Sequence, residues 1–344
     1  MKRGITIVLA LAGIALFVYV VVRAGPERIW DTLKKISPLE FLVLILLRLV
    51  FWGLRAVNWQ AVLTRCGDRA GLLHLFNARM AGHALGYITP TSRIGGDAFK
   101  ALMVEKVPQR KVIASVIIDK TIELLATALL IPVGLGILVW SAALPRTQTL
   151  TYLGATVLML SLVIWLIYQQ KQGFFTRLLN LLNRFRLGRE FRRRHESKIA
   201  DTDTLMSVFY SRHRDRFALV FFGYLAFIGL WAVEIYVSLR FLGCTDVTLE
   251  KSFLIIILGS VAFILPGVPG SVGIYEMTYL SIFALLGMSA SHAIGLILVR
   301  RALDILMAGW GLVVILRRGR GAWERVFPGG SRPETVPAPK NQAS

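Results

Sequence analysis

Apolar stretches of about twenty residues recur along the whole chain. An α-helix needs about 20 residues of this kind to cross the hydrocarbon core of a bilayer. The mean hydropathy is +0.62 and 17% of the residues are charged, and a soluble domain could not bury that much apolar surface. The sequence therefore predicts an all-α polytopic membrane protein with about six transmembrane helices, over residues 5–23, 39–63, 111–140, 149–169, 217–243 and 290–316.

The N-terminal apolar stretch has two interpretations. Lys2 and Arg3 precede it, as in a secretory signal, and Val22-Arg23-Ala24 resembles a cleavage site. However, the apolar run is longer than the usual core of a signal peptide. A retained first transmembrane helix is therefore the favoured interpretation.

Two further apolar regions, about 75–105 and 252–287, are interrupted by Pro and Gly. The first contains GYITPTSRIGGD at 86–97, and the second contains LPGVPGSVG at 265–273. Each region is either one kinked span or two short helices that enter and leave on the same side. The halves are too short for two full crossings at about 1.5 Å per residue, so we expect re-entrant helical hairpins.

The distribution of basic residues supports this topology. With two hairpins, the N-terminus, residues 65–79, residues 171–216 and the C-terminus all lie on one side, and most of the basic residues outside the spans lie in these four segments. Such a bias is the positive-inside rule, which makes both termini cytoplasmic. It also accounts for the net charge of +20 without nucleic acid, so we expect no nucleic-acid partner.

The order of elements repeats, which predicts two membrane repeats at residues 1–143 and 144–326. RIGGDAFKAL at 93–102 corresponds to SVGIYEMTYL at 271–280, and ASVIIDKTIELLA at 114–126 corresponds to GLILVRRALDILM at 295–307. The two hairpins enter from opposite faces, so the repeats are inverted, as in many transporters. A basic amphipathic segment at 173–191 is expected to lie at the cytoplasmic interface; the alternative is that it packs on the protein. The tail at 327–344 is expected to be disordered.

Many ionisable residues fall inside the predicted spans and hairpins, where each costs roughly 2.5 to 3.5 kcal/mol at a helix centre. They must pair with one another or line a hydrated cavity. Lys120 and Arg240 are expected to form internal ion pairs or to reach the membrane interface. His83 is expected to pack against other side chains inside the bundle. The candidate lipid-binding residues are Arg48, Arg55, Arg93, Asp97, Asp119, Glu123, Glu234, Glu276, Arg300, Arg301 and Asp304.

Glycines at the hairpin tips suggest a second kind of anion contact. A Gly-rich turn at the start of a helix presents free backbone N–H groups and the positive end of the helix dipole, which suits a phosphate. The alternative is that these glycines only allow close helix packing. The candidate tip residues are Gly95, Gly96, Gly270, Ser271 and Gly273.

Signatures of soluble enzymes are missing. There is no P-loop, no dinucleotide-binding glycine fingerprint and no paired-histidine metal motif. Cys66 and Cys244 are expected at opposite faces as free thiols, and the Asp201-Thr202-Asp203 triplet is a weak sign of a glycosyltransferase. We expect no metal and no cofactor.

Three motifs carry a resemblance to a known family: GHALGYITPTSRIGGDAFKALMV from Gly82, SVIIDKTIELLA from Ser115 and FILPGVPGSVGIYEMTYLSIF from Phe263. With them the chain, from about residue 5 to 317, resembles the flippase-like membrane region of lysylphosphatidylglycerol synthases. The resemblance implies movement or presentation of a lipid, since in the full-length synthases this region is thought to transfer aminoacylated phosphatidylglycerol between leaflets. The chain ends shortly after the last expected span, without room for the soluble synthase domain, so we expect no synthase activity.

The leading hypothesis is a transporter of the bacterial inner membrane that moves a phosphate-bearing lipid, anionic or polyprenyl-linked, between leaflets by alternating access. Arginines would neutralise the headgroup, and carboxylates would hold those arginines in the empty state or carry coupling protons. One alternative is a non-catalytic subunit that presents lipid to a separate lipid-synthesis enzyme. Another is an intramembrane lipid-modifying enzyme with Glu123 or Glu276 as a base.

Overall fold

The computed structural model shows an α-helical bundle, with no β-strand among the residues that it describes. These are residues 22, 27, 30, 31, 34–67, 69–88, 92–105, 107–140, 146–177, 189–262 and 274–326. Several of the expected features lie outside them: nearly all of the first span, the turn at 89–91, residues 178–188 of the amphipathic segment, the second tip at 263–273 and the tail.

Five long helices form the body of the bundle: α3 (Pro38–Arg65), α6 (Gln109–Trp140), α7 (Arg146–Lys171), α10 (Arg214–Phe241) and α13 (Ala290–Val326). Each covers one of the five remaining predicted spans. The start of α3 shows how the local sequence sets a boundary. The Ser37 hydroxyl accepts from the Glu40 backbone N–H, the Glu40 carboxylate accepts from Ser37 N–H, and Pro38 occupies the first helical position. The additional helix α9 (Arg189–Arg212) precedes α10.

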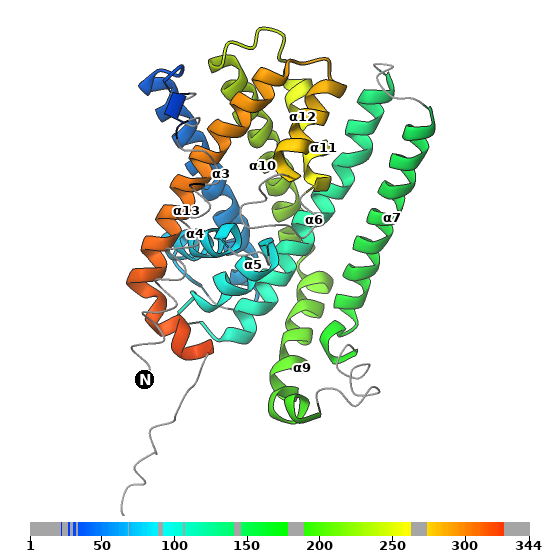
Figure 1. Ribbon diagram of the computed structural model, residues 1–344. Coiled ribbons are helices and arrows are strands. Elements are labelled where there is room, and N and C mark those ends of the chain that lie inside the picture. Colours follow the sequence, from blue (N-terminus) through cyan, green and yellow to red (C-terminus); the bar gives the residue numbers. More distant parts are fainter. Residues whose placement is uncertain are drawn as a thin grey trace, which may run out of the picture.

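Both interrupted regions are pairs of short helices, as expected. They are α4 (Leu72–Ile88) with α5 (Ser92–Leu102), and α11 (Leu249–Ala262) with α12 (Ile274–Leu285). In Figure 1, α4 and α5 lie in the lower half of the bundle, whereas α11 and α12 lie in the upper half. The chain reaches α4 from the lower end of α3 and leaves α5 for the lower end of α6. The second pair is connected in the same way at the upper end, between α10 and α13.

Helix contacts join the first part of the chain to the second. Helix α13 packs on α4, and α6 packs on α11. Helix α3 packs along α10 at the centre. These contacts bring residues 38–140 together with residues 214–326.

Glycine allows α4 and α5 to cross at very short range. A Cβ atom added to Gly96 would lie 2.3 Å from the carbonyl oxygen of Gly82, and one added to Gly82 would lie 2.6 Å from that of Gly96. A third close approach, of Gly311 to the Met80 carbonyl, joins α13 to α4. Small residues serve helix contacts of this kind in membranes, so these glycines fix the position of the first helix pair.

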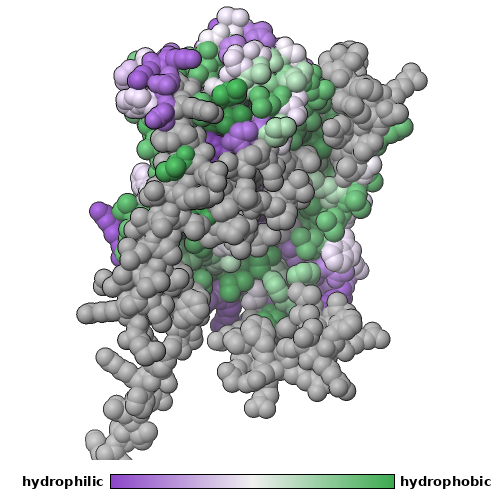
Figure 2. All heavy atoms as spheres, viewed as in Figure 1, coloured by the Kyte–Doolittle hydropathy of each residue, from purple (hydrophilic) through white to green (hydrophobic). Residues whose placement is uncertain are grey.

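The outer surface carries many large apolar side chains. Helix α7 exposes Leu150, Leu153, Val157, Leu158, Leu162, Ile164, Trp165 and Tyr168, and it is held to the bundle mainly by α6 and α9. Figure 2 shows hydrophobic residues along the flanks and hydrophilic residues gathered toward the two ends. A surface of this extent favours lipid as its surroundings.

By length and apolar composition alone, two helices within the described part, α6 over Gln109–Leu138 and α10, could cross a membrane. That criterion does not establish the expected six spans or the re-entrant nature of the helix pairs. Helix α3 carries Arg48 and Arg55 within its length, and α13 carries Arg300, Arg301 and Asp304, and these charges lower the average hydropathy of both helices. Whether these helices can span depends on how those charges are paired.

Candidate functional site

Arg48 and Arg55 lie on one face of α3, and both point into the bundle. Arg48 is buried and donates to two carboxylates, over 2.7 Å to Glu234 Oε1 on α10 and over 3.1 Å to Asp304 Oδ1 on α13. Arg55 donates over 2.7 Å to Glu123 Oε2 on α6. The seven-residue spacing thus places two cations in the interior, as the sequence predicts.

A continuous series of ion pairs, here called the ion-pair chain, begins at Arg55. Bases and acids alternate along it, and consecutive members are 2.6 to 3.8 Å apart. It connects α3, α6, α5 and α4. In order, its members are Arg55, Glu123, Lys120, Asp97, Lys100, Asp119 and Arg79.

Asp119 is the most enclosed member of this chain, with 0% of its surface exposed. Arg79 Nη2 donates to its Oδ2 over 2.6 Å, and the Tyr224 hydroxyl donates to its Oδ1 over 2.5 Å. Lys100 Nζ lies 3.6 Å from the same carboxylate, and the Trp59 ring borders both Lys100 and Arg79. A buried carboxylate with three partners is a fixed structural centre of the site.

A second group of charges, here called the arginine cluster, joins Arg48 of α3 to residues of α10, α12 and α13. It consists of Arg48 with Glu234 and Asp304, of Arg301 with Glu276, and of Arg300 with Tyr275. Lys120 and Arg301 each pair with an acid of a short helix. Lys120 pairs with Asp97 in α5, and Arg301 with Glu276 in α12.

Arg300 differs from the other buried arginines. Its side chain is 3% exposed, and no carboxylate of the described residues lies within ion-pair distance of it. Its Nε donates to the Tyr275 hydroxyl over 2.6 Å, and its guanidinium lies 5.0 Å from the centre of the Trp231 ring. Arg300 Nη1 and Trp231 Nε1 are both buried and have no hydrogen-bond partner within the described structure. The positive charge of the guanidinium and these two unsatisfied N–H donors together favour an anion as their partner.

The tip glycines do not lie where the sequence reasoning placed them. Helix α5 begins at Ser92, so Gly95 and Gly96 lie inside the helix and not in the turn that precedes it. Gly96 serves the crossing with Gly82, which is the packing alternative for that residue. Gly270, Ser271 and Gly273 lie outside the described residues, as does the side chain of Arg93.

Other singled-out residues have structural contacts. His83 lies against the Trp52 ring, at 4.7 Å between ring centres, in agreement with a packing role. Arg240 is exposed at the end of α10 and donates to the Thr245 carbonyl over 3.4 Å. Asp203, from the acidic triplet, accepts from the backbone N–H groups of Phe175 and Thr176, which supports a structural role for that acid.

Sequence reasoning missed several partners of the predicted charges. Arg79 and Lys100 lie within the first interrupted region, and the cost of placing a charge in an apolar segment could have identified both. Tyr224, Tyr275 and Trp231 give no signal, because a Tyr or Trp in an apolar helix does not show by itself which charge it contacts.

Comparison with known proteins places this bundle among membrane proteins. The chain is 23% identical over 342 residues to a UPF0104 membrane protein of the archaeon Methanothermobacter thermautotrophicus, an alignment that covers 95% of this chain and 98% of the relative. No solved structure matches the chain. The model of one protein family, the lysylphosphatidylglycerol synthase TM region, matches residues 6–311, and the chain therefore belongs to that family of membrane proteins.

Proposed function

We propose that this protein moves a lipid with an anionic phosphate group between the two leaflets of its membrane by alternating access, without catalysing a covalent step. The observation that carries the proposal is the buried Arg300 guanidinium, which has an unsatisfied Nη1 and no carboxylate partner among the described residues. A phosphate oxygen would accept from Arg300 Nη1 and from Trp231 Nε1. Arginine suits phosphate because its planar fork matches two oxygens at once.

The charge balance of the interior supports an anionic substrate. The ion-pair chain and the arginine cluster together contain seven Lys and Arg side chains and six carboxylates. An excess positive charge in a low-dielectric interior is costly, and a bound anion would remove that cost. A zwitterionic headgroup would not change the balance.

The carboxylates have a definite part in this proposal. Glu234 and Asp304 hold Arg48 while the site is empty, and Glu123 holds Arg55. An entering phosphate would compete for these arginines, and its departure would restore the ion pairs. This exchange of partners would couple the headgroup to α3, α10 and α13, because those helices carry the paired groups.

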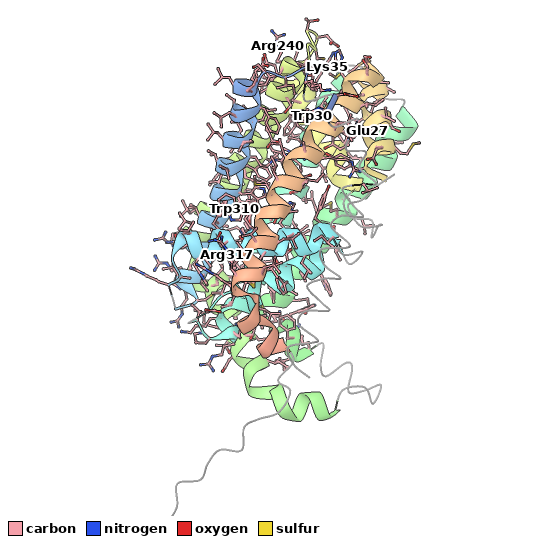
Figure 3. The ribbon with its side chains drawn as sticks, turned by 60° about the vertical axis from the view of Figure 1, so that its left-hand side comes forward. Glu27, Trp30, Lys35, Arg240, Trp310 and Arg317 are labelled. Atoms are coloured by element: carbon pink, nitrogen blue, oxygen red, sulfur yellow. The ribbon has the colours of Figure 1, made fainter. Side chains whose placement is uncertain are left out.

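The arrangement of the helices supports two inverted repeats with re-entrant hairpins. The short-helix pairs lie in opposite halves of the bundle, and each is entered and left from one end (Figure 1). Helix α9 and the C-terminal part of α13, which are rich in Lys and Arg, lie toward the lower end, whereas the connection from α10 to α11, with Asp246 and Glu250, lies at the upper end together with Arg240 (Figures 1 and 3). By the positive-inside rule the lower end would be cytoplasmic, in a bacterial inner membrane. The proposal includes a separate lipid-synthesis enzyme as the partner that would supply the lipid.

Purified protein in liposomes gives a direct test. Fluorescent phosphatidylglycerol or phosphatidylcholine is placed in both leaflets, and a membrane-impermeant reductant then destroys the outer dye. The proposal expects the reductant to reach the inner pool of the phosphatidylglycerol probe much faster than in protein-free liposomes, and faster than the phosphatidylcholine pool. Liposomes that contain heat-denatured protein control for leakage.

Two outcomes would count against transport. If no lipid moves under any ion gradient although folded protein is present, the transport proposal is wrong. If in addition anionic lipid copurifies with the protein, the alternative of a subunit that binds and presents lipid would replace it.

A further inference from the structure

Three potential metal ligands meet at the upper end of the bundle, away from the ion-pair chain. Cys244 and Asp246 lie in the connection between α10 and α11, and His292 lies in the first turn of α13. One ligand atom from each residue lies within 4.8 Å of the other two. Figure 3 marks this end of the molecule by Arg240, in the last turn of α10.

We propose that Cys244, Asp246 and His292 bind a divalent transition-metal ion, with Zn²⁺ as the best match. A thiolate, an imidazole and a carboxylate are the ligand types that proteins use for zinc. Three protein ligands leave a fourth tetrahedral position for water. Calcium and magnesium are less suitable because they prefer oxygen ligands.

The backbone holds the cysteine in place before any metal binds. Gly243 has a φ of +80°, which favours glycine, and the Cys244 N–H donates to the Leu239 carbonyl over 2.9 Å. This is the Schellman arrangement that ends α10. Cys244 is only 1% exposed, so its sulfur is held in a fixed interior position. A preorganised ligand of this kind loses little entropy when a metal binds.

His292 offers a ring nitrogen to the cluster from the first turn of α13. Its Nδ1 is buried and has no hydrogen-bond partner in the described structure. A buried ring nitrogen without a hydrogen bond is rare, and coordination of a metal ion at this cluster would give it a partner.

Metal binding would replace a proton that the ligands now share. The Cys244 thiol donates to Asp246 Oδ1, with sulfur and oxygen 3.1 Å apart. When a divalent ion binds, the S–H bond breaks, a metal–sulfur bond forms and the proton leaves to solvent. Lys251 contacts the other carboxylate oxygen of Asp246 over 3.5 Å, which keeps that side chain oriented.

A bound ion would tie the connection before α11 to the start of α13. These two elements flank the upper helix pair, so the ion would restrain the upper end of the bundle. The inference does not depend on lipid movement, because it rests on a different group of residues at a different place.

Cobalt gives a specific readout of the proposed site. Purified full-length protein in detergent is freed of metal and titrated with Co²⁺ under reducing conditions. We expect one Co²⁺ per chain, with the near-ultraviolet charge-transfer band of a sulfur–cobalt bond, and loss of the band when Zn²⁺ is added. The Cys244→Ser variant should lack the band. The matched Cys66→Ser variant should keep it, because Cys66 is the other buried thiol and lies outside the proposed site.

Two further variants keep the inference testable if Cys244→Ser does not fold. His292→Ala and Asp246→Asn should each weaken Co²⁺ binding by about tenfold or more, with an unchanged gel-filtration profile. The inference is overturned if the folded wild-type protein shows no sulfur–cobalt band. It is also overturned if the band persists in Cys244→Ser or disappears in Cys66→Ser.

Discussion

The guanidinium of Arg300 lies 5.0 Å from the centre of the Trp231 ring, and this aromatic face borders it where a carboxylate borders Arg48. A cation over an aromatic ring gains about 0.5 to 2 kcal/mol. The ring therefore orients Arg300 without neutralising it, and leaves its charge available to an anion.

Trp231→Leu should therefore weaken the binding of phosphatidylglycerol by about two- to thirtyfold, the equivalent of the lost ring contact. Equilibrium binding of a short-chain lipid in detergent measures the change. Trp310→Leu is the matched control, because that tryptophan lies on α13 away from Arg300 and donates to Asn77 (Figure 3). An equal loss in both variants would contradict the role assigned to Trp231.

Asp119→Asn should lower the free energy of unfolding by about 3 to 5 kcal/mol, because it leaves the buried Arg79 without its charge partner. Unfolding in mixed micelles measures the difference from the wild-type protein. Asp201→Asn removes the half-exposed ion pair with Arg110 and should cost less than about 1 kcal/mol. A loss for Asp119→Asn as small as that expected for Asp201→Asn would contradict a stabilising role of the ion-pair chain.

Gly96→Ala should reduce the yield of monodisperse protein sharply. The added Cβ would lie 2.3 Å from the Gly82 carbonyl oxygen, so α4 and α5 would have to separate. Gly136→Ala in α6 is the control, since its Cβ would meet no atom within 4 Å and alanine favours a helix by about 1 kcal/mol. Gel filtration after extraction measures both. A normal profile for Gly96→Ala would mean that this helix crossing is looser than described.

Single cysteines at Glu105 and Glu250 should react with an impermeant maleimide from opposite sides of the membrane. Both residues are exposed; the first lies in the connection from α5 to α6 and the second at the start of α11, and these elements lie in opposite halves of the bundle (Figure 1). The natural thiols should contribute little, because burial raises the pKa of Cys66 to about 12 and that of Cys244 to about 11. Below those pH values the reactive thiolate is scarce. Labelling of both new cysteines from the same side would contradict the inverted topology.

The sequence predicts much of the fold because its helices are marked by local features. The Pro and Gly interruptions separate α4 from α5 and α11 from α12, and the spacing of Arg48 and Arg55 places both on the inner face of α3. These features depend only on helix periodicity and on residues that break helices.

The partners of the charged residues could not be predicted in the same way. Arg48 bonds acids on α10 and α13, and Arg79 bonds Asp119 on α6, so each pairing depends on how distant helices pack. The same limit applies to Cys244 and His292, which come together only because the connection from α10 to α11 lies against the start of α13. Gly96 was placed at a tip because a glycine pair resembles a turn, whereas its actual role depends on the facing Gly82.

The most direct test of the proposed transport is the leaflet exchange rate of Arg300→Gln in liposomes. An Arg–phosphate contact contributes about 1.5 to 3 kcal/mol, so we expect exchange of phosphatidylglycerol to fall about ten- to hundredfold. Arg240→Gln, which changes an exposed arginine at the end of α10, should exchange lipid at the wild-type rate. Wild-type exchange by a folded Arg300→Gln protein would contradict the assignment of Arg300 as the headgroup ligand.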